Sequence, residues 1–267
     1  MASFAVGPLF AADPELFDAH IHYSRDARDY LSVQQALERL RAAGIRHALV
    51  SSSGDVGTRE LYALAPELVI PSLRPYRAPG ESASWMHDES VIGFVERRLR
   101  DGRYAAIGEF HVYGSDVDLP VVKRMIELAR DYGLPLHVHG DAEAIEGIFH
   151  RDPAARVLWA HAGFEGPMQV DALLRRYPAL WAELSMRGEV AAGGKVSESW
   201  RAVLIAHADR FMVGTDTYTP WRWDEVLEHA EWTRAWLADL PPAVAQRIMY
   251  ENGATLFRAW LQSATAP

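Results

Sequence analysis

The sequence contains no cysteine. This absence excludes disulfides, cysteine-bound zinc, iron–sulfur clusters and a thiolate nucleophile. Any metal must therefore be held by histidine, aspartate or glutamate. No apolar run approaches the roughly 18 residues of a membrane span, so no membrane partner is expected. The chain also has little positive charge, since 27 Lys and Arg against 36 Asp and Glu give a net charge of −9. Because this field repels a phosphate backbone, a nucleic-acid partner is not expected.

Nothing in the 267 residues divides the chain, because there is no low-complexity tract and no Ser/Gly linker. We therefore expect one domain over residues 1–267, with residues 1–14 as an N-terminal leader segment. The leader has no basic start and is short for a signal peptide. A cytoplasmic location is predicted, with the periplasm as the alternative if the leader remains from a removed export signal. The composition is compatible with a monomer or a homo-oligomer.

One form repeats along the chain: a short apolar run, a loop, and a longer helical pattern. Eight such units in about 250 residues predict a single (β/α)8 TIM barrel, an α/β fold. An open doubly wound sheet is the structural alternative, but no G-x-G-x-x-G follows the first run. The predicted strands are 16–22, 46–52, 68–76, 104–112, 134–140, 156–163, 180–187 and 211–217. The predicted helices are 32–43, 89–100, 119–132, 141–150, 168–177, 197–208, 224–237 and 242–260.

Alternation along the predicted strands places polar side chains inside the barrel, toward its C-terminal end. In the first strand the outward set is Phe17, Ala19 and Ile21, and the inward set is Asp18, His20 and His22. In the seventh strand Met186 is expected to face outward. The other polar residues expected to face inward are Arg74, Glu109, His111, His137, His139, Glu183, Ser185, Arg187 and Asp216. Barrel enzymes place their chemistry at this end of the strands.

Histidines and carboxylates gather at these strand ends, which predicts a metal site. His20 and His22 lie on one face of a strand, close enough to share one cation. The candidate metal ligands are His20, His22, Glu109, His139, His161 and Asp216. Imidazole and carboxylate ligands suit Zn²⁺, Mn²⁺ and other divalent transition metals. The remaining histidines are expected to be solvated or locally paired in helices and loops, namely His47, His87, His150, His207 and His229.

At these residues the sequence resembles the amidohydrolase superfamily, in its amidohydrolase-related branch, with a secondary resemblance to TatD-like hydrolases. The likeness runs from Phe-Asp-Ala-His-Ile-His at residues 17–22 to Gly-Thr-Asp-Thr at 214–217 and an Asn-x-x-x-x-Phe tail at 252–257. The resemblance implies that His20, His22, His139, His161 and Asp216 surround one or two divalent metals. Glu109 matches the acid that bridges two metals in TatD-like proteins.

Two departures from the TatD-like pattern argue against a nuclease. Asp141 stands where those proteins usually carry a basic residue, and Phe-His-Val follows Glu109 where they carry Gly-Leu-Asp. The choice of His139 as ligand rests on its place nearer the strand end. His137, one layer deeper, is expected to support a ligand or to belong to the core.

These residues predict a metal-dependent hydrolase of a small ester, lactone, amide or phosphoester. One cation is expected on His20, His22 and Asp216, with or without a second on Glu109, His139 and His161. Zn²⁺ is the predicted metal, with Mn²⁺ as an alternative. The cation lowers the pKa of water from about 15.7 to about 7. Asp216 is the expected general base, and Glu109 is also expected to be catalytic.

Two arginines near the site suggest a substrate that carries a carboxylate or phosphate. Arg74 and Arg187 are therefore predicted to bind substrate, together with His111, unless each arginine is paired with a neighbouring acid. Asp18 is expected to hold the second nitrogen of a metal ligand or to bond to backbone. Three other functions remain open: a decarboxylase or hydratase on the same barrel, a TatD-like nuclease, and a metal-binding protein without catalysis.

Overall fold

A closed barrel of eight parallel strands forms the centre of the molecule. The structure is a computed structural model that describes residues 14–264. The strands follow the order β1-β2-β3-β4-β5-β6-β7-β10, and a parallel bridge between Asp18 and Val213 brings the last strand back beside the first. Their bounds are β1 Leu16–His22, β2 Ile45–Ser51, β3 Val69–Leu73, β4 Ala106–His111, β5 Leu136–His139, β6 Val157–Trp159, β7 Leu180–Glu183 and β10 Phe211–Met212. The predicted TIM barrel is confirmed.

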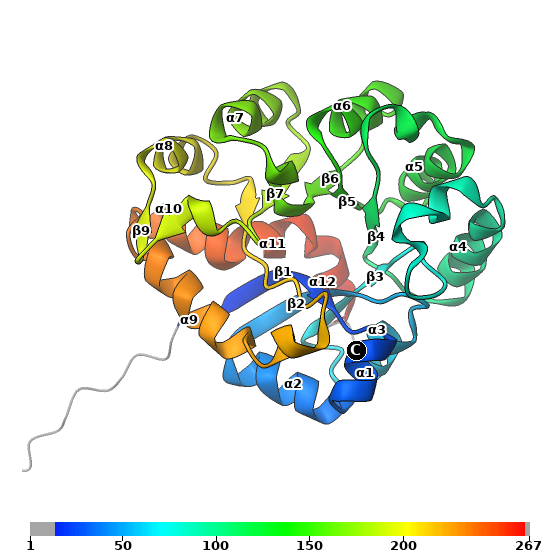
Figure 1. Cartoon of the computed structure of the whole chain (residues 1–267), viewed down its shortest axis with the longest axis horizontal. Helices are drawn as coiled ribbons and strands as arrows, with labels where there is room; N and C mark the ends of the chain where they lie inside the picture. Colours follow the sequence, from blue (N-terminus) through cyan, green and yellow to red (C-terminus); the bar gives the residue numbers. More distant parts are fainter. Residues whose placement is uncertain (1–13, 265–267) are drawn as a thin grey trace, which may run out of the picture.

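Helices surround the strands (Figure 1). They are α1 Arg25–Tyr30, α2 Val33–Ala42, α3 Val56–Leu64, α4 Ser90–Asp101, α5 Pro120–Tyr132, α6 Ala142–Arg151, α7 Pro167–Arg176, α8 Glu198–Ala206, α9 Val226–Leu237, α10 Pro242–Gln246, α11 Asn252–Leu256 and α12 Arg258–Ala264. A hairpin of β8 (Ala191–Ala192) and β9 (Lys195–Val196) precedes α8. None of the helices in residues 14–264 combines the length and apolarity that a bilayer crossing needs. The predicted leader, residues 1–14, lies outside the described residues except for Pro14.

Three helical segments differ from the prediction. Helices α1 and α3 were not expected, and Gly57 and Thr58 in the first turn of α3 are poor helix formers. Gly57 is required by close packing, since a Cβ there would lie 1.8 Å from the carbonyl oxygen of Tyr23. The single helix expected at 242–260 is instead broken into α10, a π-helical turn (Arg247–Glu251), α11 and α12.

Several strands end earlier than predicted. β6 ends at Trp159, and the chain then turns through left-handed backbone at His161, Ala162, Gly163 and Phe164, with φ of 56°, 46°, 62° and 56°. β7 ends at Glu183, so strand alternation does not extend to the residues that follow. As a result Met186, expected to face the helices, instead lines the central cavity.

An irregularity in β1 reverses three predicted orientations, those of Phe17, Asp18 and Ala19, the last of which joins Phe17 in an inner cluster. Between Asp18 and Ile21 the first strand advances three residues while β2 advances two. Asp18 therefore faces outward and borders a small space beside His229 and Thr233 of α9. Phe17 belongs to a cluster with Ile70 of β3 and Leu158 of β6. Because β3 and β6 are not neighbours, that cluster must lie inside the barrel, where it fills the end opposite the cavity.

Candidate metal centre

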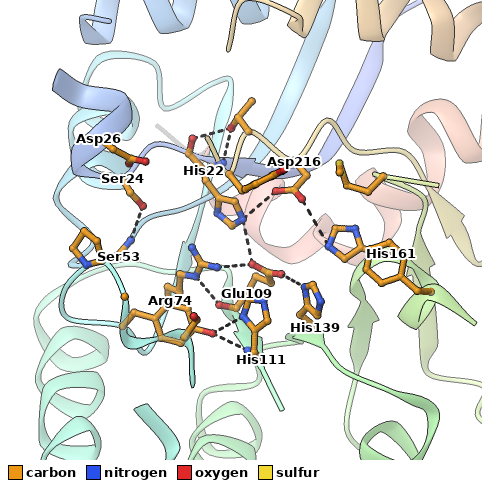
Figure 2. A pocket seen from close by; sticks show the side chains of 18 residues that line it. His22, Ser24, Asp26, Ser53, Arg74, Glu109, His111, His139, His161 and Asp216 are labelled. Atoms are coloured by element: carbon orange, nitrogen blue, oxygen red, sulfur yellow. Dashed lines mark hydrogen bonds and ion pairs between the residues drawn. The ribbon is translucent and has the colours of Figure 1, made fainter. Parts of the chain in front are cut away.

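A cavity of about 410 Å³ opens where the barrel strands end. Figure 2 shows that His22 and His161 point toward Asp216, and that Arg74, His22 and His139 point toward Glu109. The lining residues are His22, Ser24, Asp26, Ser53, Arg74, Tyr76, Pro79, Gly80, Ser82, Glu109, His111, His139, His161, Phe164, Met186, Asp216, Thr217 and Tyr218. Such a volume suits a small-molecule ligand. The cavity thus brings together the predicted ligands, apart from His20, which lies just below its surface.

Three histidines at the bottom of the cavity have their Nδ1 atoms occupied by acceptors. His20 Nδ1 lies 2.9 Å from Oε1 of Glu183, and His161 Nδ1 lies 3.0 Å from the carbonyl oxygen of Ser185. His22 Nδ1 faces the carbonyl oxygen of Ser51 at 3.3 Å. A carbonyl or a carboxylate can only accept, so each Nδ1 that faces one carries a proton. In the neutral form of each ring the lone pair is therefore on Nε2.

These Nε2 atoms converge on one another and on Asp216. The Nε2 atoms of His20 and His22 are 2.9 Å apart, and Asp216 Oδ1 lies 3.7 and 3.4 Å from them. His161 Nε2 lies 3.8 Å from Oδ2 of the same carboxylate. Two ligands of one zinc ion, each at 2.0–2.1 Å from it, are about 3 Å apart. We call His20, His22, His161 and Asp216 the floor of the site.

The floor fits a divalent cation. Two facing lone pairs at 2.9 Å repel unless a proton or a metal ion lies between them. Oδ1 of Asp216 is buried and has no hydrogen-bond partner among the described residues. Unpaired buried polar atoms are costly, and they call for an ion or a water. The donor atoms of His20, His22 and Asp216 all lie within 4.8 Å of one another. These are the three residues that were predicted to hold the first cation.

A second group, the charged wall, consists of Arg74, Glu109, His111 and His139. Oε2 of Glu109 accepts a hydrogen bond from Arg74 Nη2 at 2.7 Å, and Oε1 lies 2.8 Å from His139 Nδ1. Figure 2 shows Glu109 between these two partners. A register irregularity between Gly108 and Phe110 accompanies the inward projection of Glu109 from β4, as bulges often re-aim a side chain. His139 therefore joins Glu109 as predicted, whereas His161 belongs to the floor.

The remaining wall residue, His111, is held by an aromatic neighbour. Its Nδ1 lies 2.8 Å from the hydroxyl of Tyr76, and that hydroxyl accepts the His111 backbone N–H at 2.7 Å. The His111 ring stacks on His139 with centroids 4.0 Å apart. Burial lowers the pKa of His111 to about 4, so its ring is neutral at pH 7.

The carboxylates govern the charge of the floor. Burial disfavours the charged form of His20, but Asp216, Glu109 and Glu183 outweigh it and raise its pKa well above the usual value. Burial likewise opposes ionisation of Glu109, yet His20 and Arg74 hold its pKa well below the ordinary range. The protein thus stabilises one positive charge at the position where the lone pairs meet. A metal ion would take the place of that proton.

Glu183, at the end of β7, was expected to face inward but was not predicted to belong to the site. It is fully buried, and it contacts the ring of His20 and the backbone of His161. Burial raises the pKa of its carboxyl, but the two histidines outweigh burial and the pKa falls below the usual range. The alternation of apolar and polar residues along 180–187 places Glu183 on the inward face, and this was the sequence signal that could have identified it as part of the site.

Each of two supporting residues takes one of its predicted alternatives. Asp18 does not hold a ring nitrogen: its Oδ1 accepts the backbone N–H groups of His20 and Thr215, at 3.0 and 3.1 Å. This matches the backbone alternative of the prediction. Burial raises the pKa of Asp18 to about 6. His137 is buried against His20, with ring centroids 4.7 Å apart, and its Nε2 has no hydrogen-bond partner among the described residues.

The expected inward orientation of Arg187 is wrong. Its guanidinium is buried and donates to the carbonyl oxygens of His161 and Glu165, at 2.6 and 2.7 Å, and it pairs with Glu189. The ring of Trp200 covers its other side at 4.8 Å. Arg187 therefore supports the left-handed turn that carries His161. Of the two predicted substrate-binding arginines, Arg74 lines the cavity and Arg187 does not.

The other histidines lie outside the cavity lining. His207 pairs with Asp171 at 2.7 Å, and His229 lies 3.4 Å from the hydroxyl of Thr233. His87 ends a short 3-10 helix (Trp85–His87), and His150 lies in α6. His47 differs from the expected helix or loop position, because it lies buried in β2.

Comparison with known proteins assigns the family. A family model described as Amidohydrolase matches residues 17–259. The chain belongs to the amidohydrolase family. This confirms the resemblance seen in the sequence and supports the predicted hydrolase class. A search of curated proteins found no match.

Several solved structures share the barrel. An uncharacterised TIM-barrel protein from Bordetella bronchiseptica is 16% identical, with a TM-score of 0.63 over 93% of this chain and 99% of that one. A probable 2-pyrone-4,6-dicarboxylic acid hydrolase from Acinetobacter baumannii is 10% identical, with a TM-score of 0.57 over 91% and 99%. An amidohydrolase from Burkholderia multivorans is 16% identical, with a TM-score of 0.57 over the same shares. At these identities the likeness establishes the fold alone.

Proposed function

We propose that this amidohydrolase is a metal-dependent hydrolase that cleaves an ester, lactone, amide or phosphoester bond of a small molecule bearing a carboxylate or phosphate. The observation that carries the proposal is the floor: three Nε2 lone pairs and an unpartnered oxygen of Asp216 meet at the bottom of a cavity of about 410 Å³. Zn²⁺ is the proposed metal because imidazole and carboxylate suit it, with Mn²⁺ as the alternative.

The floor residues would hold the cation and move the proton. When bound, a divalent cation lowers the pKa of water and polarises a carbonyl or phosphoryl oxygen. Asp216 accepts the proton of the attacking water and passes it to the leaving group, the general-base role. The backbone N–H of Asp216 donates to the carbonyl oxygen of His20 at 2.7 Å, which ties the base to the strand of the ligand pair.

The charged wall supplies the rest of the catalytic environment. Glu109 is ionised and held by Arg74, and its Oε1 fixes the ring of His139 through Nδ1. The ring of His139 would then lie against the oxygen of the substrate on which negative charge develops. This gives Glu109 its catalytic role without requiring that it bridge two metals.

Arg74 is the proposed contact for the substrate anion. Its Nε and Nη2 donate to the backbone and side chain of Glu109, whereas Nη1 has no hydrogen-bond partner among the described residues. A guanidinium with a free amino group at a cavity surface suits a carboxylate or phosphate. The Acinetobacter baumannii structure has citric acid bound, which agrees with a carboxylate-bearing ligand for this fold.

The proposal is tested with the purified chain loaded with Zn²⁺ or Mn²⁺. Carboxylate-bearing lactones, esters and amides and a phosphoester are offered in ¹⁸O-labelled water, and the products are analysed by mass spectrometry. Incorporation of ¹⁸O into the product without release of CO₂ supports hydrolysis. Release of CO₂ would favour a decarboxylase, and a chain that binds neither metal would overturn the metal-dependent mechanism.

A further inference from the structure

We propose that Glu183 is a positioning residue that sets the ring orientation and tautomer of two metal-binding histidines at once. The inference rests on the proposed function for the identity of the ligands. Glu183 is 0% exposed and lies beneath the floor, outside the cavity lining. It therefore acts on the chemistry only through the residues that it holds.

Each oxygen of Glu183 accepts hydrogen bonds from the site. Oε1 lies 2.9 Å from His20 Nδ1 and accepts the backbone N–H of His161 at 2.7 Å. Oε2 accepts the backbone N–H of Ser185 at 2.6 Å. An ionised carboxylate has no proton to donate, so it holds His20 with the proton on Nδ1 and the lone pair on Nε2.

Ser185 links Glu183 to the ring of His161 and fixes the tautomer of that ring as well. Its Oγ donates to Oε1 of Glu183 at 3.0 Å and lies 2.9 Å from His161 Nδ1. Because its carbonyl oxygen also faces that Nδ1, the His161 ring has the same tautomer as His20. One buried carboxylate thus controls both ligands, although β7 is adjacent in the barrel to β6 and not to β1.

His22 provides an internal comparison. Its Nδ1 faces the carbonyl oxygen and the hydroxyl of Ser51, which are neutral partners, at 3.3 and 2.9 Å. A carboxylate behind a metal-binding imidazole fixes the ring and makes its other nitrogen more basic than a neutral partner does. His20 is therefore the stronger donor of the pair, and that strength depends on Glu183.

Glu183→Gln is a sharp test because a glutamine cannot replace all of these contacts. One orientation points its amide N–H groups at the backbone N–H of Ser185, and the other points them at His20 and His161. Either way a donor faces a donor. Asp55→Asn is the matched control, since Asp55 is also 0% exposed but bonds to Tyr104 and pairs with Arg98, away from the floor.

The experiment measures Co²⁺ binding and histidine tautomers in the full chain. Competition with a chelator is expected to show a 10–100-fold weaker Co²⁺ affinity in Glu183→Gln, together with a changed visible spectrum of bound Co²⁺. In metal-free protein, at a pH high enough that the His20 ring is neutral, ¹⁵N NMR of the ring nitrogens is expected to show that His20 loses its single Nδ1–H tautomer. Asp55→Asn should match the wild type in both measurements.

Two outcomes would overturn the inference. Wild-type Co²⁺ affinity and tautomers in Glu183→Gln, with only a lower melting temperature, would leave Glu183 a structural role. An equal loss of affinity in Asp55→Asn would make the effect one of stability. If the wild type binds no Co²⁺, the proposed metal mechanism fails, while the tautomer measurement still decides the role of Glu183.

Discussion

The floor and the charged wall line the same cavity, yet their polar atoms are satisfied differently. In the floor, the nitrogens that face the cavity are held from behind, and Oδ1 of Asp216 has no partner among the described residues. In the wall, Glu109 already lies between Arg74 and His139, and its Oε2 also lies 3.2 Å from Nε2 of His22 and 3.5 Å from Nε2 of His20. A bound ion can replace the proton of the floor, whereas Glu109 is already paired with the guanidinium of Arg74.

This difference bears on the number of metals. A second cation bridged by Glu109 would have to compete with the guanidinium of Arg74, which lies 2.7 Å from Oε2. Arginine remains charged at any ordinary pH, so the competitor cannot be removed by deprotonation. We therefore expect one tightly bound cation for each chain, held by the floor. Four substitutions test this division.

The largest effect is expected from His20→Ala. Removing one lone pair of the facing pair should abolish tight metal binding and lower kcat/KM by about 10³-fold or more, since the metal supplies several kcal/mol of stabilisation. Metal content and kinetics measure this. His47→Ala is the control, because His47 lies in β2 outside the cavity. Full metal content in His20→Ala would contradict the assignment of the floor.

A large effect on turnover is expected from Asp216→Asn. Loss of a general base lowers kcat by about 10²–10⁴-fold. An amide oxygen still offers a lone pair, so most of the metal affinity should remain. Titration with Zn²⁺ beside steady-state kinetics separates the two roles. If metal affinity falls as far as in His20→Ala, Asp216 acts chiefly as a ligand.

A smaller effect, on KM, is expected from Arg74→Lys. Lysine keeps the charge but lacks the planar guanidinium, whose separate N–H groups can reach Glu109 and the substrate at the same time. KM for an anionic substrate should rise about 10–100-fold, the range of a hydrogen bond to a charged group. A neutral analogue should be affected less. An equal rise for both substrates would mean that Arg74 serves only to hold Glu109.

The smallest effect is expected from Phe164→Ala at the rim of the cavity. Phe164 is 55% exposed, and its ring stacks on His161 with centroids 4.8 Å apart. The free energy of unfolding should change by about 0.5 kcal/mol or less, as for other surface sites. Chemical denaturation measures this change, and metal titration checks the floor. A marked loss of metal affinity would show that the floor needs this ring.

Strand alternation predicted much of the site. His22 and His139 end their strands on the inward face that the period of two predicts, whereas His20 and Glu109 lie at irregularities of β1 and β4 and still project inward. His161 and Asp216 lie beyond the ends of β6 and β10, in left-handed backbone. They were still identified because each lies at the end of a predicted strand and also matches the family motif.

Alternation failed where a strand is irregular or has ended. The bulge in β1 turned Asp18 outward and Phe17 inward, because one extra residue reverses every orientation on one side of it. After β7 ends, Met186 has φ of 63° and lines the cavity, while Arg187 turns away to bind carbonyl oxygens. No hydrophobic pattern in the sequence marks a bulge or the point where a strand ends.

The sequence by itself determined a cysteine-free barrel of eight strands, with its histidines and acids at the C-terminal ends. Those properties follow from composition, period and short motifs, which are local. Only the tertiary structure decided that His161 joins the floor, that Arg74 occupies one side of Glu109, and that Glu183 holds His20 across 163 residues of chain. The partner of a ring nitrogen decides whether that nitrogen carries the proton. Only the closed barrel brings the partner into contact with the ring.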